Sequence, residues 1–538
     1  MNNKRKTQLN WSRKAVVYQI YPRSFKDSDN DGVGDLQGII DKLDYLNDGT
    51  EKSLGIGAIW LSPIYKSPMV DYGYDISDYL DIDSIFGNLK TFDRLVKEAH
   101  KRSIKIIMDF VANHTSNKHL WFEESRSSKT NPKRDWYIWK DPKPDGLPPN
   151  NWLSVFGSSA WTFDKKTQQY YMHSFLPEQP DLNWRNNEVK TTMEKVLEFW
   201  IHRGVDGFRS DATYHLIKDD QFRDEPPNPN YEGPKDSYDG LIHTYSQRQP
   251  ETLDVINTFC SVLGLHQNKY IVSEAYLDIP EMAKLYKACS NNLHAPFNFN
   301  LISLPWDAKL VRNHIDDFEA SLSKNDWPNY VLGNHDRPRI ITRIGEKRTR
   351  LLAMLLFTLR GMPFVYYGDE IGMENEDIPP DKQKDLVGNS LAANRDGERT
   401  PMQWDDSAYS GFSTTEPWLP INRKYKDVNV KKELNDPLSM LHLYRQLIHY
   451  RTHNHVLLHG SYRSLDLGDS HIFAYLRELG NEKVLVILNF SKDEESVSFP
   501  YQKVNVVYTT SGEKEGKIID LKKMTLAPYQ GYVVEVIN

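Results

Sequence analysis

The stretch NEVKTTMEKVLEFWIHRGVDGFRSD, residues 187–211, contains the alternation that decides the fold. Apolar residues recur in its first part at intervals of three and four, which places them on one face of a helix. They are Val189, Met193, Val196, Leu197, Trp200 and Ile201. A short run, 205–209, follows with the length and composition of a β-strand. The stretch therefore predicts one helix followed by one strand.

Similar short runs lie on both sides of this stretch, separated by helical segments. Several are nearly all apolar, as expected for parallel strands that are covered on both faces. The predicted strands are 16–20, 58–61, 104–108, 205–209, 270–272, 296–299, 330–332 and 363–367. Eight strands that alternate with helices over roughly 400 residues predict an α/β fold, a (β/α)₈ TIM barrel.

Two regions depart from this alternation. Residues 113–183 are rich in Trp, Pro and Asn, without a helical period, and are too long for a loop. After about residue 458 only short strands separated by turn residues follow, which predicts an antiparallel β-sandwich domain. A helix before them is expected to begin at Asp436-Pro437. The predicted organisation is a barrel formed by 1–112 and 184–457, an inserted domain at 113–183, and a β domain at 458–538.

The composition is that of an ordinary globular protein. Hydrophobic residues make up 39% and charged residues 26%, and the net charge is −7. Such a mild negative charge argues against a nucleic-acid or membrane surface as partner. No apolar run is long enough to span a bilayer, and none follows the charged N-terminus as in a signal peptide. The two cysteines, Cys260 and Cys289, are expected to be free thiols. These features favour a cytoplasmic enzyme.

Ionisable side chains follow the predicted strands at the end where a TIM barrel carries its active site. A single Asp at such a place is usually a helix cap. Independent capping explains poorly why acids follow so many strands. The residues concerned are Asp71 and Tyr74 after the second strand, Asp109 and His114 after the third, Arg209 and Asp211 after the fourth, Glu274 after the fifth, and His335 and Asp336 after the seventh.

Two of these residues, Arg209 and Asp211, are two positions apart, so a strand points both side chains to the same side. An arginine beside an acid favours the ionised carboxylate, which suits a nucleophile. Glu274 is then the natural proton donor. The two acids would then differ in state, one ionised and one protonated.

The motifs resemble those of the α-amylase superfamily of glycoside hydrolases, and most closely its α-glucosidase and oligo-1,6-glucosidase branch. The matching stretches, in family order, are 18–25, 109–114, 179–184, 204–211, Glu274, 334–336 and 399–404. Together they are highly specific, whereas each alone would be only moderately so.

The resemblance implies a role for each matching residue. Asp211 would attack the anomeric carbon, Glu274 would act as general acid/base, and Asp336 would hold sugar hydroxyls. The expected sugar-binding residues are Asp71, Tyr74, His114, Arg209, His335 and Arg399. Asp71 and Arg399 would grip the far end of the sugar and make cleavage exo-acting. The implied enzyme is a retaining α-glucosidase that acts on short gluco-oligosaccharides as small-molecule substrates; its oligomeric state stays open.

The residue after the nucleophile, Ala212, bears on linkage. In relatives with the same motif, valine there accompanies α-1,6 cleavage and a smaller or polar residue accompanies α-1,4 cleavage. We therefore expect a preference for α-1,4 linkages.

The segment Asp27-Ser28-Asp29-Asn30-Asp31-Gly32-Val33-Gly34-Asp35 resembles a calcium-binding loop, with acids at alternate positions and Gly at the sixth. The twelfth position is Gly38, so the segment is not an EF-hand. The superfamily branch often holds Ca²⁺ in the corresponding loop. The expected ligands of a structural Ca²⁺ are Asp27, Asp29, Asp31, the Val33 carbonyl and Asp35. The alternative is an acidic, solvated turn.

Two other functions stay open. A glucosyl transferase, or an isomerase that converts sucrose or trehalose, would share the covalent intermediate and differ in whether water or a sugar accepts the glucosyl group. A non-catalytic relative associated with an amino-acid transporter would belong to another class, but such proteins tend to lack the catalytic acids that this chain retains.

Overall fold

The computed structural model describes residues 11–234, 237–289, 293–385, 394–468, 471–501, 503–511 and 516–537. Its centre is an eight-stranded sheet in the order β11-β10-β9-β5-β2-β1-β13-β12, and every pairing in it is parallel. The strands are β1 Val17–Ile20, β2 Ala58–Leu61, β5 Lys105–Phe110, β9 Gly207–Ser210, β10 Tyr270–Ser273, β11 His294–Pro296, β12 Asn329–Val331 and β13 Met362–Tyr366.

The two edge strands of this sheet, β11 and β12, are joined through one side chain. The Asn329 amide nitrogen donates to the Pro296 carbonyl at 2.6 Å, and its oxygen accepts from the Asn298 backbone N–H at 3.0 Å. These bonds complete the barrel that the strand pattern predicts. The sixth strand ends at Pro296, whereas the apolar run predicts 296–299, because the backbone of Asn298 bonds to a side chain instead of a strand.

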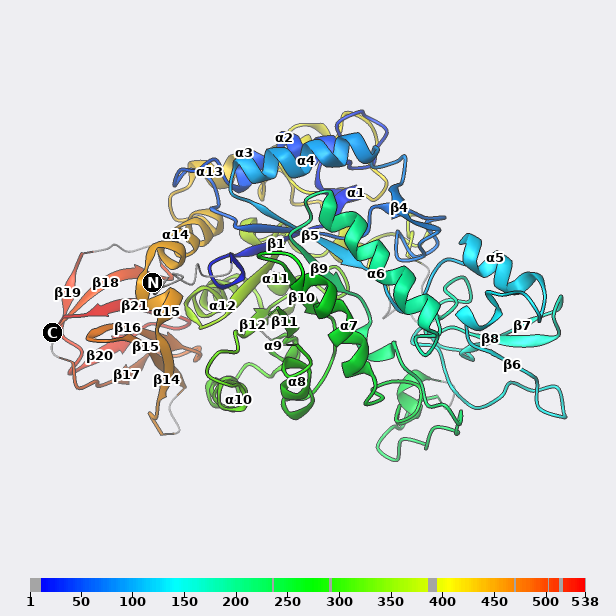
Figure 1. Cartoon of the computed structure of the whole chain (residues 1–538). Helices are drawn as coiled ribbons and strands as arrows, with labels where there is room; N and C mark the ends of the chain where they lie inside the picture. The colour runs from blue at the N-terminus through cyan, green and yellow to red at the C-terminus, as the bar shows by residue number, and fades with distance from the viewer. Residues whose placement is uncertain are drawn as a thin grey trace, which may run out of the picture.

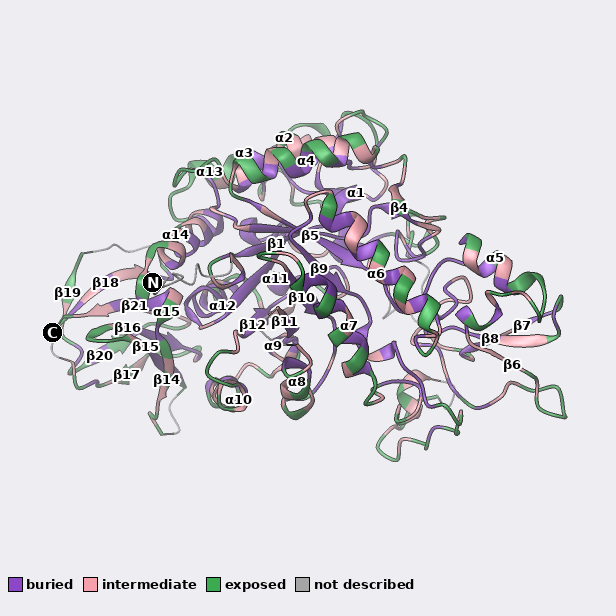
Figure 2. Cartoon of the chain, viewed as in Figure 1, coloured by how far each residue is buried: buried purple, intermediate pink, exposed green. Residues whose placement is uncertain are grey.

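Helices cover the outside of the barrel, and most of the longer ones bury one face (Figures 1 and 2). The helix α12, Glu346–Thr358, is instead buried at every position from 351 to 358. In α6, Asn187–His202, the buried residues are the predicted apolar stripe. The other longer helices are α2 Leu36–Asp41, α4 Leu89–Lys101, α7 Thr252–Gly264, α8 Ile279–Tyr286, α10 Ala308–Ser321, α12 Glu346–Thr358 and α14 Met440–His453. The shorter ones are α1 Pro22–Phe25, α3 Leu43–Leu46, α9 Asn300–Ser303, α11 Ile340–Ile344, α13 Val430–Asn435 and α15 His455–His459.

The start of α14 differs from the prediction. Asp436 ends α13, and Ser439 caps α14 by accepting a hydrogen bond from the His442 backbone N–H. Ser439 is as good an N-cap as Asp436. The sequence offers both caps within four residues, and the packing of α13 selects the later one.

The segment between β5 and α6 carries its own small structure at one end of the molecule (Figure 1). It contains α5 Leu120–Ser127 and an antiparallel sheet in the order β6-β8-β7. The strands are β6 Trp139–Lys140, β7 Trp161–Asp164 and β8 Gln169–Met172. The hairpin of β3, Tyr65–Lys66, and β4, Asp78–Ile82, leaves the barrel after β2.

The C-terminal region forms an antiparallel sheet at the opposite end, in the order β14-β15-β16-β21-β18-β19, with β17 and β20 paired separately (Figure 1). Its apolar residues form a core of their own, which includes Ile472, Leu485 and Val534. The strands are β14 Ser461–Leu465, β15 Ile472–Leu479, β16 Glu482–Asn489, β17 Glu495–Val497, β18 Val504–Thr509, β19 Ile518–Ile519, β20 Met524–Leu526 and β21 Gly531–Val536.

The two cysteines form a disulfide, so the expectation of free thiols is wrong. Cys260 lies in α7 and Cys289 lies three residues after α8, with their Cα atoms 5.9 Å apart. That separation lies in the usual range for a disulfide. The bond joins the two helices that precede and follow β10, a proximity that the sequence spacing does not reveal.

Candidate active site

A cavity of about 360 Å³ lies at the carboxyl ends of the barrel strands. Most of the residues predicted from the strand ends form its wall. They are Asp71, Tyr74, His114, Asp211, Glu274, His335 and Asp336. Arg209 and Arg399 are each 1% exposed and lie behind this wall, bonded to its acids.

Arg209 is the centre of the acid cluster. Its Nη1 donates to Asp211 Oδ1 at 2.5 Å and to Asp109 Oδ1 at 2.7 Å, and its Nη2 lies 2.8 Å from Glu274 Oε2. The strand register explains this arrangement, because Arg209 on β9 pairs with Asp109 on β5 and with Val272 on β10. One guanidinium thus holds the two predicted catalytic carboxyl groups close together.

The acids of this cluster hold protons more tightly than usual. Burial raises the pKa of Asp211 and of Glu274 to about 7, and that of Asp109 to about 6, against the opposing effect of Arg209. Because one positive charge faces three carboxyl groups, the cluster retains a proton near neutral pH. A site that cleaves glycosides with one ionised and one protonated carboxyl group needs this condition.

The loop after Asp211 fixes the position of Glu274. The Ala212 backbone N–H donates to Glu274 Oε2 at 3.0 Å, and the Thr213 N–H donates to the Glu274 carbonyl at 3.1 Å. Ala212 has a φ of 44°, in the left-handed region. Its methyl group lines the cavity beside both carboxyl groups.

His335 and Tyr74 form one side of the cavity. Their rings stack with centroids 5.4 Å apart and planes 5° apart, and the Tyr74 hydroxyl lies 2.7 Å from His335 Nε2. His114 lies beside the backbone of Tyr74: its Nε2 is 3.1 Å from the Tyr74 carbonyl oxygen and 3.2 Å from the Gln179 amide nitrogen. Burial lowers the pKa of His114 to about 4 and that of His335 far below its usual value. Both imidazoles are therefore neutral at pH 7.

Asp336, by contrast, is ionised. Burial would raise its pKa, but the positive charges of Arg395, Arg399 and Arg209 outweigh this effect and hold the pKa well below its usual value. Arg399 Nη2 donates to its Oδ1 at 2.9 Å. A fixed anion of this kind can accept hydrogen bonds from two sugar hydroxyls.

The far end of the cavity is closed by Arg395, which the sequence reasoning missed. Its Nη2 donates to Asp71 Oδ1 at 2.8 Å, its Nη1 to Asp336 Oδ1 at 3.0 Å, and its Nε to Asp385 Oδ2 at 2.7 Å. The expected partner of Asp71 was Arg399, but Arg399 bonds to Asp336 and to the His335 carbonyl. The pair at the closed end is thus Asp71–Arg395. Arg395 lies four residues before the 399–404 motif, outside every matching stretch, and only the fold reveals its place beside Asp71.

Other residues of the wall also carried no signal in the sequence. Phe156 and Phe175 reach the cavity from the segment between β5 and α6, and Tyr276 and Arg337 reach it from loops of the barrel. The Gln179 amide nitrogen donates to Asp71 Oδ2 at 3.0 Å. Gln179 lies in one of the motifs noted above, which could have identified it.

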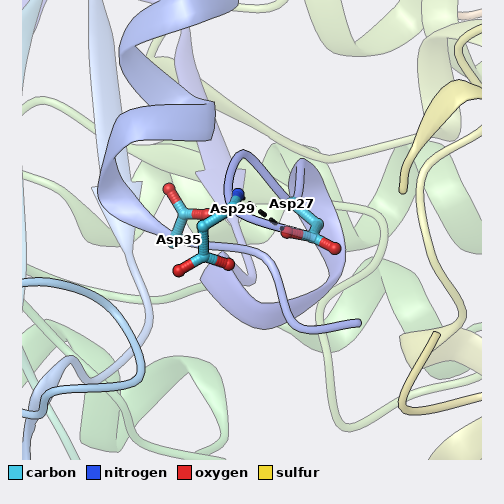
Figure 3. A group of neighbouring side chains, drawn as sticks. All are labelled: Asp27, Asp29 and Asp35. Atoms are coloured by element: carbon cyan, nitrogen blue, oxygen red, sulfur yellow. Dashed lines mark hydrogen bonds between the residues drawn. The ribbon is translucent and has the colours of Figure 1, made fainter. Parts of the chain in front are cut away.

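The acidic loop after α1 gathers three of the predicted metal ligands. Carboxylate oxygens of Asp27, Asp29 and Asp35 lie within 4.8 Å of one another (Figure 3). Oxygen ligands at that separation suit Ca²⁺, whose bonds to oxygen are about 2.3–2.6 Å long. The surrounding burial and the neighbouring aspartates raise the pKa of Asp29, as expected where carboxylates crowd together. Asp31 lies outside this group, and its Oδ1 accepts from the Val33 backbone N–H at 2.8 Å.

The barrel and its cluster of paired carboxyl groups define a class of protein, the glycoside-cleaving (β/α)₈ enzymes. Two family models match the chain: the α-amylase catalytic domain over residues 19–460 and the C-terminal domain of the α-amylase SusG over residues 472–533. The first match covers most of the chain.

Individual relatives agree with these matches. An oligo-1,6-glucosidase of Parageobacillus thermoglucosidasius is 37% identical, with 98% of this chain and 99% of the relative covered. An α-glucosidase of Culex pipiens is 39% identical, with coverages of 97% and 90%. A crystal structure of the α-glucosyl transfer enzyme XgtA has a TM-score of 0.91 and 37% identity, and the match covers 98% of this chain and all of that one. The chain belongs to the α-amylase family, in its α-glucosidase branch, and is a glycoside hydrolase.

Among the described residues, no helix combines the length and the hydropathy needed to cross a membrane.

Proposed function

We propose that this chain is a retaining, exo-acting α-glucosidase that hydrolyses short α-linked gluco-oligosaccharides, with a preference for α-1,4 bonds. The observation that carries the proposal is the sharing of the Arg209 guanidinium by Asp211 and Glu274. Retaining enzymes need two carboxyl groups only about 5–5.5 Å apart, whereas inverting enzymes need a wider gap for a water molecule. Two acids on adjacent nitrogens of one guanidinium favour the narrower spacing.

In the first step, an Asp211 oxygen attacks the anomeric carbon while Glu274 gives its proton to the glycosidic oxygen. The bond between that carbon and oxygen breaks, the sugar on the leaving side departs as an alcohol, and a glucosyl ester forms on Asp211. In the second step, Glu274 takes a proton from water, and the water oxygen replaces Asp211 on the anomeric carbon. Two inversions give α-glucose.

The closed end supports exo-action. The Arg395 side chain bonds to both Asp71 and Asp336, and all three line the cavity, so we expect them to close it beyond the first sugar. A chain that continued past the non-reducing glucose would meet buried charged groups. Asp71, Asp336 and the neutral imidazoles of His114 and His335 would bond to the hydroxyls of that glucose.

A second candidate function is glucosyl transfer, in which a sugar replaces water as acceptor in the second step. The high structural similarity to XgtA favours this candidate. An isomerase that converts sucrose is another form of the same chemistry, and solved isomaltulose synthases are also similar to this chain.

We predict that maltose is cleaved with a higher kcat/KM than isomaltose. The reason is the small Ala212 methyl group, 4% exposed in the cavity beside Glu274, which leaves room for a leaving sugar held close to the acid. The measurement is kcat/KM on maltose, isomaltose, sucrose and trehalose, with the products resolved by chromatography. Free glucose as the main product supports hydrolysis, and longer or rearranged sugars support the second candidate.

The paired variant for this prediction is Ala212→Val, which should shift the ratio toward isomaltose by about 1–3 kcal/mol. Because residue 212 has a positive φ, a β-branched side chain is strained there in any case. Ala212→Thr has the same branching but carries a hydroxyl in place of one methyl group, and it serves as the control. If isomaltose is the better substrate of the wild type, the linkage preference is wrong, while the mechanism stands.

We propose further that Ca²⁺ binds at the acidic loop through Asp27, Asp29 and Asp35 and stabilises the fold. A chelator should lower Tm by roughly 2–5 °C, because a ligand that binds only the native state stabilises it. Asp29→Asn should remove this response. Asp31→Asn, outside the group of three, should retain it. An unchanged Tm, with no metal detected by elemental analysis, would overturn the calcium assignment.

A further inference from the structure

The side of the cavity that receives the leaving group has its own chemistry. Glu274 must reach the glycosidic oxygen, so the leaving group lies beyond Glu274, away from the closed end at Asp71 and Arg395. The wall there includes Tyr214, Tyr276 and Arg337. This wall therefore decides which leaving group is accepted.

Two arginines meet at Tyr276. The Arg337 guanidinium lies over the Tyr276 ring at 5.0 Å from its centre, and Phe299 stacks on that ring with centroids 4.6 Å apart. The Arg248 Nη2 donates to the Tyr276 carbonyl at 3.3 Å. A sugar at this position would therefore meet the Arg337 guanidinium, whereas Arg248 lines a neighbouring cavity.

Arg248 is held in an unusual conformation. Its φ is 58°, in the left-handed region, and its backbone N–H donates to the Tyr214 carbonyl at 2.8 Å. It lines a second cavity of about 550 Å³, and Tyr214 lies in the walls of both cavities. A strained non-glycine residue that is fixed beside an active site indicates a functional constraint.

Neither arginine has a direct carboxylate partner among the described residues, although, against the opposing effect of burial, Tyr276, Asp336 and Glu274 raise the pKa of Arg337. Arg209, Arg395 and Arg399 each pair with carboxylates of the site. Within the described ranges of the chain, by contrast, no carboxylate lies within ion-pair distance of Arg248 or Arg337. The acids of the second cavity have other partners: Asp278 caps α8, and Glu281 pairs with Lys284.

We propose that the leaving-group side binds an anionic sugar, and that Arg337 and Arg248 are the residues that recognise its charge. This inference rests on the proposed glucosidase function and adds to it the class of leaving group. A phosphate or carboxylate on the leaving sugar would accept charge-assisted hydrogen bonds from the guanidinium groups, which are roughly twice as strong as neutral ones. The preferred substrates are α-glucosides of a sugar phosphate or a sugar acid.

The test compares three substrates that differ only at C6 of the leaving sugar: maltose, its 6-phosphate with the phosphate on the leaving glucose, and the corresponding glucuronic acid. At low salt, kcat/KM for the phosphate should exceed that for maltose by on the order of tenfold or more. Added NaCl should reduce this ratio, because salt screens exposed charges. The disaccharide with glucuronic acid as the leaving sugar shows whether a single negative charge is sufficient to raise kcat/KM above that for maltose.

The variants Arg337→Gln and Arg248→Gln should each lower the ratio, and the double variant should bring it close to one. The control is Arg423→Gln, which removes an equal charge from a side chain that is 70% exposed and outside both cavities. Tm shows whether each variant is folded. A wild-type ratio of one or less, or a ratio that the double variant leaves unchanged, overturns the inference. If none of the three substrates is cleaved, the proposed function fails as well.

Discussion

Asp211→Asn should lower kcat by roughly 10⁴-fold or more, because no other group can form the glucosyl ester. The asparagine amide keeps an oxygen that can accept a hydrogen bond from Arg209 Nη1. In the wild type this nitrogen donates to Asp211 Oδ1 at 2.5 Å. The variant should therefore fold. The measurement is kcat on the best substrate of the panel, together with Tm.

The effect on stability has a defined sign. Burial raises the pKa of Asp211 from 3.8 to about 7 in the folded chain, so ionisation opposes folding as the pH rises through this interval. Asparagine does not ionise, and the variant should be at least as stable as the wild type above pH 7. A second variant, Asp211→Gly, leaves space for azide, which should form β-glucosyl azide by a single inversion. Near-normal kcat in folded Asp211→Asn would rule out Asp211 as nucleophile.

Glu274→Gln should lower kcat on natural sugars by about 10²–10⁴-fold, since both steps lose their proton transfer. Aryl glucosides with good leaving groups need no acid in the first step, so the glucosyl enzyme should accumulate with them. Azide needs no general base, so it should attack the accumulated glucosyl enzyme and release the glucosyl group as α-glucosyl azide. This is the opposite anomer to the β-glucosyl azide expected from Asp211→Gly. The pair of variants therefore distinguishes nucleophile from acid/base.

The pH profile provides a further control. In the wild type, kcat/KM should rise with pH as Asp211 ionises and fall as Glu274 loses its proton, which gives a bell-shaped profile centred near pH 7. The two apparent pKa values of this profile describe the coupled pair of acids and not either residue alone. In Glu274→Gln with an activated aryl glucoside, only the acidic limb should remain. If kcat/KM of Glu274→Gln still falls at alkaline pH, a residue other than Glu274 is the general acid.

Much of the fold could be predicted because its periodicity is local. The stripe on α6 and the apolar runs of the barrel strands are visible within short windows of sequence. The acids at the strand ends follow from the barrel, because parallel strands bring their carboxyl ends to one face. Asp211 and Glu274 were predicted in this way, and the structure places them on the same guanidinium.

The rest depends on contacts between distant residues. Arg395 is 324 positions from Asp71, and no local pattern distinguishes it from Arg399 as its partner. The disulfide depends on how α7 and α8 pack. The sequence argument also took Arg209 to favour an ionised Asp211, but burial has the larger effect and raises the pKa of both acids. Local charge is visible in a sequence, whereas desolvation by the whole barrel is not.

The most direct test of the account is to trap the glucosyl enzyme with 5-fluoro-α-glucosyl fluoride, which forms the ester quickly and releases it slowly. The account predicts one fluoroglucosyl group per chain, located by mass spectrometry of peptides on Asp211, and no labelling of Asp211→Asn. A label on another carboxylate, or an active enzyme that takes no label and releases β-glucose, would contradict it.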